Sequence, residues 1–96
     1  MRLHVRSVLD VAHVLGGKEH ILDMDEGAAV GGLISLLLAR YGDPLEALLL
    51  QSRDPMELLP HVKVYVNGRG VDFIDGLYTA LRDGDDVLLM PQIGGG

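Results

Sequence analysis

One apolar stripe between residues 30 and 41 constrains the fold of this chain most strongly. Its six side chains recur at i, i+3, i+4, i+7, i+8 and i+11, along one side of a helix: Val30, Leu33, Ile34, Leu37, Leu38 and Tyr41. Gly42 follows as a C-terminal stop, and Pro44 prevents the helix from continuing. Such a stripe has to be buried against another layer, so the chain needs a sheet for this helix to cover.

Alternating polar and apolar residues predict the first strands of that sheet. Residues 2–8 place Leu3 and Val5 on one face and Arg2, His4 and Arg6 on the other. Residues 20–24 are a plausible second strand, which would form a hairpin with the first.

The second half of the chain predicts three more strands. Residues 61–66 alternate, with valine at every second position on one face. Asn67-Gly68 predicts a hairpin turn, because both positions tolerate positive φ, and a return strand is expected to begin at Val71. The last strand is expected at residues 86–90.

The connecting segments complete the predicted architecture. Residues 9–15 are expected to be a short apolar connection, residues 44–50 a second short helix, and residues 51–59 a surface loop. The order strand, strand, helix, strand, short strand, strand predicts an α+β fold. In this fold one main helix packs across a mixed sheet of four to five strands.

The composition narrows the class of protein. A length of 96 residues suits one domain with a single core, and an aromatic content of 4% makes that core aliphatic. The chain has no cysteine, which excludes disulfides, thiolate nucleophiles and cysteine-bound iron–sulfur clusters. A net charge of −6 disfavours nucleic acid, whose phosphates need a basic surface, and is compatible with a basic partner protein.

Neither membrane insertion nor metal binding is predicted. The longest apolar run, near residues 36–39, is far too short to span a bilayer. The first residues alternate instead of forming a signal peptide, so we expect a cytoplasmic protein. No pair of histidines has a compact metal-ligand spacing among His4, His13, His20 and His61. With no nucleophile setting either, we expect no metal site and no enzymatic activity of its own.

The C-terminal segment is the candidate functional site. It reads Ile93-Gly94-Gly95-Gly96, and a flexible tail without Cβ atoms can carry its carboxylate into a narrow enzyme channel. A frayed end without function is the alternative. Pro91 lacks a backbone donor, so it is expected to end the last strand. Alternation in residues 88–90 places apolar surface beside the tail, which often marks a partner interface.

Three segments together carry a family resemblance: VYVNGRGV at residues 64–71, LRDGDDV at 81–87 and PQIGGG at 91–96. They resemble the MoaD/ThiS family of small sulfur carriers, which includes the small subunit of molybdopterin synthase and the thiamin-pathway carrier. The resemblance covers essentially the whole chain and implies the ubiquitin-like β-grasp fold. It divides the chain into a β-grasp domain at residues 1–90 and an extended Gly-Gly tail at residues 91–96.

The resemblance also implies the chemistry of the tail. An E1-like adenylyltransferase would use ATP to adenylate the carboxylate of Gly96, next to Gly95, and a persulfide sulfur would then replace the adenylate to leave a thiocarboxylate. No cofactor would stay bound to the carrier. An acceptor enzyme, such as a large synthase subunit, would receive the sulfur, without nucleic acid or membrane. The residues expected to contact these partners are Gly94, Ile93, Pro91 and Met90.

Two departures from the family pattern leave the pathway open. Gln92 stands where the molybdopterin synthase subunit usually has a second proline, and Gly94 where it usually has alanine. Molybdenum cofactor biosynthesis is the leading expectation, while carriers for thiamin, cysteine or tRNA thiolation share nearly the same pattern. A ubiquitin-like modifier conjugated to lysines of other proteins uses the same tail. A binding-only β-grasp domain with an inert tail is the remaining alternative.

Overall fold

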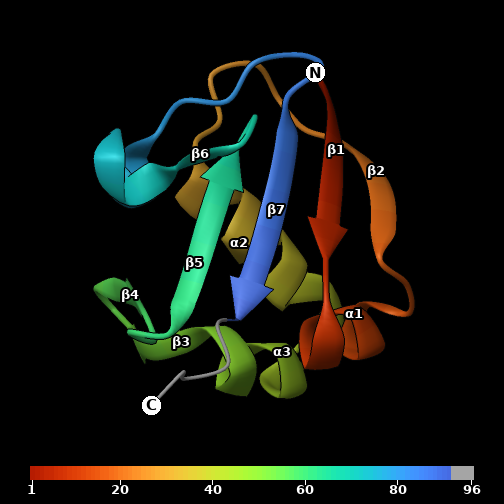
Figure 1. Cartoon of the computed structure of the whole chain (residues 1–96), viewed down its shortest axis with the longest axis vertical. Coiled ribbons are helices and arrows are strands. Elements are labelled where there is room, and N and C mark those ends of the chain that lie inside the picture. The colour runs from red at the N-terminus through yellow and green to blue at the C-terminus, as the bar shows by residue number, and fades with distance from the viewer. Residues whose placement is uncertain (92–96) are drawn as a thin grey trace.

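The computed structural model describes residues 1–91, which form a five-stranded sheet with the α-helices on one side of it (Figure 1). The strands are β1 (Arg2–Ser7), β2 (Glu19–Asp23), β5 (Val62–Val66), β6 (Arg69–Gly70) and β7 (Asp86–Pro91). Their order across the sheet is β2-β1-β7-β5-β6. The central pair β1 and β7 is parallel, whereas the other neighbours are antiparallel. β1 and β2 pair as the predicted hairpin.

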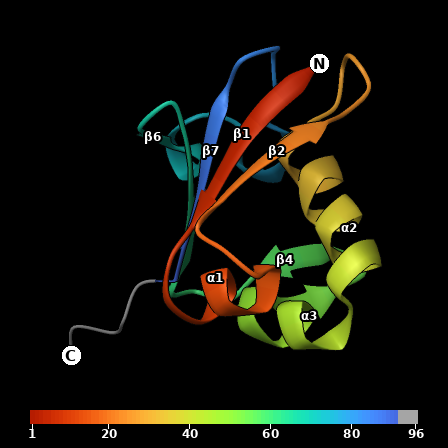
Figure 2. The same ribbon diagram turned by 90° about the vertical axis from the view of Figure 1, so that its right-hand side faces the viewer.

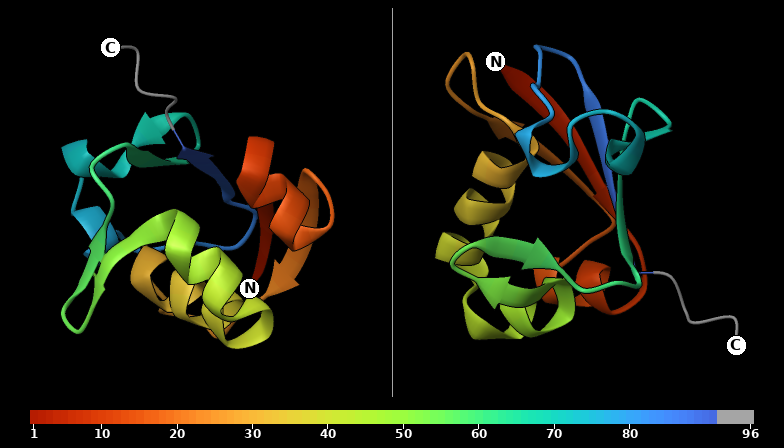
Figure 3. Two further views of the ribbon diagram at one scale, coloured as in Figure 1. Left: turned by 90° about the horizontal axis from the view of Figure 1, so that it is seen from below. Right: turned by 90° about the vertical axis from the view of Figure 1, so that its left-hand side faces the viewer.

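The main helix lies across the sheet as predicted. It is α2 (Val30–Tyr41), whereas α1 (Leu9–Leu15) and α3 (Asp43–Leu49) pack against each other near the end of β7 (Figures 2 and 3). α3 confirms the short helix predicted over residues 44–50. No helix among residues 1–91 is long and apolar enough to cross a membrane.

The core lies between α2 and the sheet, and it is aliphatic, as the composition predicts. The inward side chains of the central strands are fully buried: Leu3, Val5, Val87 and Leu89. The three alternating valines of β5 are buried with them. Of the predicted helical stripe, all residues are buried except Tyr41, which is partly exposed at the C-terminal end of α2.

Residues 9–15, predicted to be an apolar connection, form helix α1 instead. Gly16 ends the helix with φ 79°, and the N–H of Gly17 donates to the carbonyl of Ala12 at 2.9 Å. Val11 and Leu15 face the core from this helix. The prediction was wrong because so short an apolar run does not show a period that distinguishes a helix from other conformations.

Residues 51–59 contain a small hairpin where a surface loop was predicted. β3 (Leu50–Arg53) pairs with β4 (Met56–Leu58) in a separate antiparallel sheet. Arg53 Nη1 donates to Glu46 Oε1 of α3 at 2.9 Å. The hairpin is therefore fixed against the neighbouring helix, which the local sequence pattern does not reveal.

The Asn67-Gly68 turn is confirmed, but the return strand is shorter than predicted. Asn67 and Gly68 have φ 52° and 82°, and β5 pairs with β6 across them. At Val71, where a strand was expected to begin, the chain leaves the sheet and forms two 3-10 turns, η1 (Val71–Phe73) and η2 (Gly76–Tyr78). Val71 is 1% exposed, so its side chain turns into the core and draws the chain away from the sheet edge.

Candidate functional site

The residues of the predicted site divide into two groups. Residues 93–96, which include the three glycines, lie outside the described residues 1–91, so their predicted roles remain predictions. The other predicted contact residues, Met90 and Pro91, lie at the end of β7 and are both partly exposed.

β7 ends in the centre of the sheet. Pro91 lies opposite Val62 of β5, and Leu89 lies beside Ser7 of β1. The strand that leads to the C-terminus is therefore held between two neighbours almost to its end. Pro91 is its last residue, one position beyond the predicted limit of the strand.

An apolar strip lies on the face of the sheet opposite the α-helices. Leu88 and Met90 point to this face, whereas Leu89 between them is buried, as the alternation predicts. Tyr65 lies opposite Leu88 on β5, and Phe73 of η1 is 82% exposed. We refer to Tyr65, Phe73, Leu88 and Met90 as the apolar strip. Of the four, Phe73 is exposed and the others are partly exposed. Aromatic and aliphatic side chains grouped at the surface in this way are typical of protein–protein interfaces.

Gly70 allows the two aromatic rings of the strip to lie close together. It is the cross-strand neighbour of Tyr65, and a Cβ at this position would lie 3.3 Å from Phe73 Cδ2 and 3.7 Å from Tyr65 Cε1. The rings border a hollow of about 210 Å³ that Lys63 and Asp72 also line. Lys63 Nζ donates to Asp72 Oδ2 at 3.2 Å. A partner side chain inserted into such a hollow is the usual centre of a binding interface.

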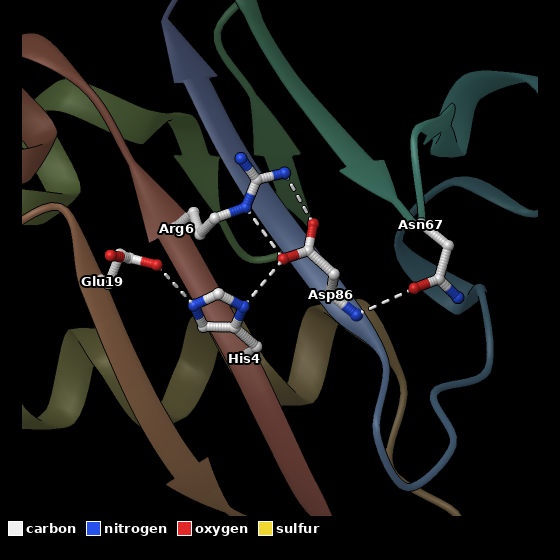
Figure 4. A network of polar contacts seen from close by, with 5 residues as sticks. All are labelled: His4, Arg6, Glu19, Asn67 and Asp86. Atoms are coloured by element: carbon white, nitrogen blue, oxygen red, sulfur yellow. Dashed lines mark hydrogen bonds and ion pairs between the residues drawn. The ribbon is translucent and has the colours of Figure 1, made fainter.

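A polar network occupies the same face at the start of β7 (Figure 4). Asp86 accepts two hydrogen bonds from Arg6 of β1, from Nε to Oδ1 at 2.8 Å and from Nη2 to Oδ2 at 2.7 Å. The ring of His4 lies between two carboxylates, with Nδ1 3.1 Å from Asp86 Oδ1 and Nε2 2.9 Å from Glu19 Oε1. The backbone N–H of Asp86 donates to Asn67 Oδ1 at 2.9 Å. These contacts connect β7 to β1, β2 and the β5–β6 turn.

Arg6 governs the ionisation of Asp86 within this network. Its hydrogen bond to Asp86 is the main reason that the pKa of the Asp86 carboxyl lies below its ordinary value, although partial burial opposes the effect. The same hydrogen bond raises the pKa of the Arg6 guanidinium. Both groups are therefore charged at neutral pH, and their charges compensate each other. The geometry supports a structural role, in which the network holds the start of β7 in register.

Sequence reasoning missed both the polar network and Phe73. Alternation in β1 correctly placed His4 and Arg6 on a polar face, but Asp86 is separated from Arg6 by 80 positions. Phe73 is the single phenylalanine of the chain and lies in a segment without strand or helix periodicity. The run of aspartates at Asp83, Asp85 and Asp86 does not reveal the network either, because a local pattern does not show which strand lies beside it.

Comparisons with known proteins identify relatives along the whole chain. A model of the ThiS family matches residues 10–96. Small archaeal modifier protein 3 of Haloferax volcanii is 38% identical over 96 residues, which cover 100% of both chains. The sulfur carrier protein CysO of Mycobacterium tuberculosis is 41% identical over 70 residues, which cover 73% of this chain and 74% of CysO.

A solved structure has the same fold. The crystal structure of SAMP1 from Haloferax volcanii matches this chain with a TM-score of 0.81 at 28% identity, covering 100% of both chains. The ubiquitin-like β-grasp fold expected from the sequence is therefore confirmed. Since the family match extends to residue 96, it includes the glycine tail that follows the described residues.

Proposed function

The chain belongs to the ThiS family, and we propose that it is a sulfur carrier protein that reacts through the C-terminal carboxylate of Gly96. One observation carries this proposal: the family match extends through the three glycines, which two residues separate from the end of a strand held in the centre of the sheet. The chain is then a co-substrate of its partner enzymes, and the catalytic groups belong to those enzymes.

The first step activates the carboxylate. In the site of an E1-like enzyme, a carboxylate oxygen of Gly96 attacks the α-phosphorus of ATP. An acyl–phosphate bond forms, the bond to pyrophosphate breaks, and pyrophosphate leaves. Neither Gly95 nor Gly96 has a Cβ that would obstruct a narrow channel around the reacting carbonyl.

The second step introduces sulfur. The persulfide of a donor protein attacks the carbonyl carbon of Gly96, AMP leaves, and an acyl disulfide joins the carrier to the donor. A second thiol then attacks the sulfur atom that belongs to the donor protein. The S–S bond to the carrier breaks, a disulfide forms on the donor side, and a thiocarboxylate stays on Gly96. An acceptor enzyme takes the sulfur from this thiocarboxylate. Molybdopterin biosynthesis remains the destination predicted from the sequence, and the similarity to CysO supports sulfur transfer without naming an acceptor.

Docking depends on the folded part of the chain. Holding each tail residue in one conformation costs about 1–2 kcal/mol, so the favourable contact energy has to come from the surface beside the tail. Leu88 and Met90 of the apolar strip lead directly to Pro91, and the hollow beside Tyr65 offers a pocket on the same face. We expect both the activating and the acceptor enzyme to cover this surface.

Activation of the full chain tests the proposal. The wild-type protein is incubated with ATP and the activating enzyme from its own cell, and pyrophosphate release is measured together with the intact mass of the carrier. With a persulfide donor present, we expect a mass increase equal to the replacement of one oxygen by sulfur. A variant that lacks Gly96 keeps residues 1–91 unchanged and is expected to release no pyrophosphate. Equal activity of the two proteins would refute a role for the terminal carboxylate.

A second candidate function is protein modification. The similarity to small archaeal modifier protein 3 over the full length of both chains favours it. In this case the adenylated Gly96 is transferred to a lysine amine of another protein, an isopeptide bond forms, and AMP leaves. Mass spectrometry of the native cell distinguishes the functions: a thiocarboxylate on the free protein indicates a carrier, whereas a C-terminal peptide of this chain joined through Gly96 to lysines of other proteins indicates a modifier. Because Arg82 is the last basic residue, tryptic digestion leaves residues 83–96 on such a lysine.

A further inference from the structure

Leu9 combines two unusual properties at the start of α1. It is a large apolar residue with 53% of its surface exposed, and its backbone has φ 56°. In this left-handed region the Cβ of an L-residue crowds the following carbonyl, so a leucine there raises the free energy of the folded state. Strain of this kind persists only where the surrounding structure over-determines it, and strained residues cluster at functional sites.

A comparison with Asn67 shows that the strain at Leu9 is not ordinary turn chemistry. These two are the non-glycine residues with positive φ among the residues described. Asn67 occupies a hairpin turn that favours asparagine, and its side chain bonds to Asp85 and to the backbone of Asp86. Leu9 is not the residue that packs α1 onto the core, since Val11, Ala12 and Leu15 form the buried side of this helix. Glycine or asparagine would fit the backbone at position 9 better than leucine does.

The position of Leu9 relates it to the C-terminus. β1 and β7 run in parallel with Ser7 beside Leu89, so both strands end at the same edge of the sheet. Leu9 follows two positions after Ser7, just as Pro91 follows two positions after Leu89. α1 contacts β7, and Figure 2 shows this helix beside the end of the strand. The exposed leucine therefore lies on the rim from which the C-terminal residues continue.

The length of the remaining chain limits where a partner can bind. Five residues follow Pro91, and fully extended they span at most about 18 Å. An enzyme that adenylates Gly96 has to enclose the reactive acyl adenylate and exclude water from it. The surface of this enzyme must then lie within this distance of the end of β7. Leu9 lies at the same edge of the sheet.

We propose that Leu9 is a contact residue for the activating enzyme, which receives the leucine side chain in an apolar pocket beside the channel for the tail. The inference rests on the proposed function, because it requires an enzyme that activates Gly96. With Leu9, the expected docking surface reaches around the end of β7. It then includes the start of α1 in addition to the apolar strip. The left-handed backbone presents the side chain outward at the cost of some stability.

The substitution Leu9→Asn separates contact from strain. Asparagine accepts positive φ but removes the apolar side chain. We expect the melting temperature to stay equal or to rise, whereas KM for the carrier in adenylation rises about tenfold with kcat unchanged. Leu9→Met keeps an apolar side chain and is expected to keep KM within about twofold of wild type.

Ile21→Asn is the matched control, because Ile21 is 59% exposed on β2, away from the end of β7. It is expected to leave KM unchanged. If the wild type is activated and Leu9→Asn has the wild-type KM, the inference on Leu9 is wrong while the proposed function stands. A melting temperature that falls in Leu9→Asn together with the loss of affinity also overturns it, because Leu9 would then serve the fold. If the wild type is not activated at all, the proposed function fails and the inference fails with it.

Discussion

The two ends of β7 differ in the contacts that hold them. At the start of the strand, Asp86 is bound within the protein by Arg6, His4 and Asn67 through charged and backbone hydrogen bonds. At its end, Met90 and Pro91 are partly exposed beside apolar neighbours. One strand of six residues therefore combines an internal polar anchor with an apolar end next to the predicted reactive tail.

This difference indicates which substitutions affect stability and which affect binding. Polar groups that already bond to each other gain little from a partner, because a new hydrogen bond only replaces an existing one. Partly exposed apolar side chains gain about 25 cal/mol for each Å² that a partner covers. Changes at the start of β7 and on its inward face should act on the fold, and outward changes near its end should act on docking.

The largest expected effect comes from the inward face of β7. Leu89 is fully buried, so Leu89→Ala leaves a cavity and is expected to lower the free energy of unfolding by about 2–5 kcal/mol. Urea denaturation followed by circular dichroism measures this loss. Leu88→Ala, on the adjacent outward position, is the control and should cost about 1 kcal/mol or less. Equal losses in both variants would contradict the assignment of the two faces.

The outward face is tested by a charge in the apolar strip. Leu88→Asp is expected to weaken binding to the activating enzyme at least about tenfold, because the partner would have to bury an unpaired carboxylate. Isothermal titration calorimetry measures the Kd. Ile21→Asp introduces the same charge at an exposed position on β2 and should leave Kd nearly unchanged. An unchanged Kd for Leu88→Asp would exclude the strip from the interface.

The polar anchor predicts a dependence of stability on pH. The pKa of Asp86 is lowered in the folded state, so the carboxylate stabilises the fold above the pKa of an unfolded aspartate and loses this effect as the pH falls through the folded pKa. Asp86→Asn should cost about 1 kcal/mol or less at pH 7, since the pair is partly exposed. The difference in unfolding free energy between wild type and variant should shrink in acid, below about pH 4. A difference independent of pH would show that ionisation of Asp86 does not matter.

The smallest expected effect on stability is at Gly70. Its φ of −62° suits any residue, and the Phe73 ring that an alanine Cβ would approach is largely exposed and free to shift. Gly70→Ala should therefore change the free energy of unfolding by no more than about 0.5 kcal/mol. The added methyl group narrows the hollow beside Tyr65, so binding to the activating enzyme should weaken by a few fold. Unchanged binding would indicate that the hollow stays empty in the complex.

Local patterns predicted some elements well and others poorly. The stripe on α2 and the alternation in β5 repeat several times, and both elements lie where they were expected. α1 and the β3–β4 hairpin are short, and the contacts that stabilise them lie in other parts of the chain. The candidate site divides in the same way. Met90 and Pro91 were predicted from their place before the glycines. Phe73 was not, because it joins the apolar strip only where the chain brings its ring close to Gly70.

By itself, the sequence determined the faces of the strands, the main helix, the hairpin turn and the C-terminal glycines, because each of these signals lies within a few neighbouring residues. The tertiary structure alone decided that β7 lies between β1 and β5, which brings Arg6 to Asp86 and Leu9 to the edge where β7 ends. The physical reason is that the alternation of a strand specifies which side chains are buried but not which strand is the neighbour. That choice depends on how all the apolar faces pack into one core.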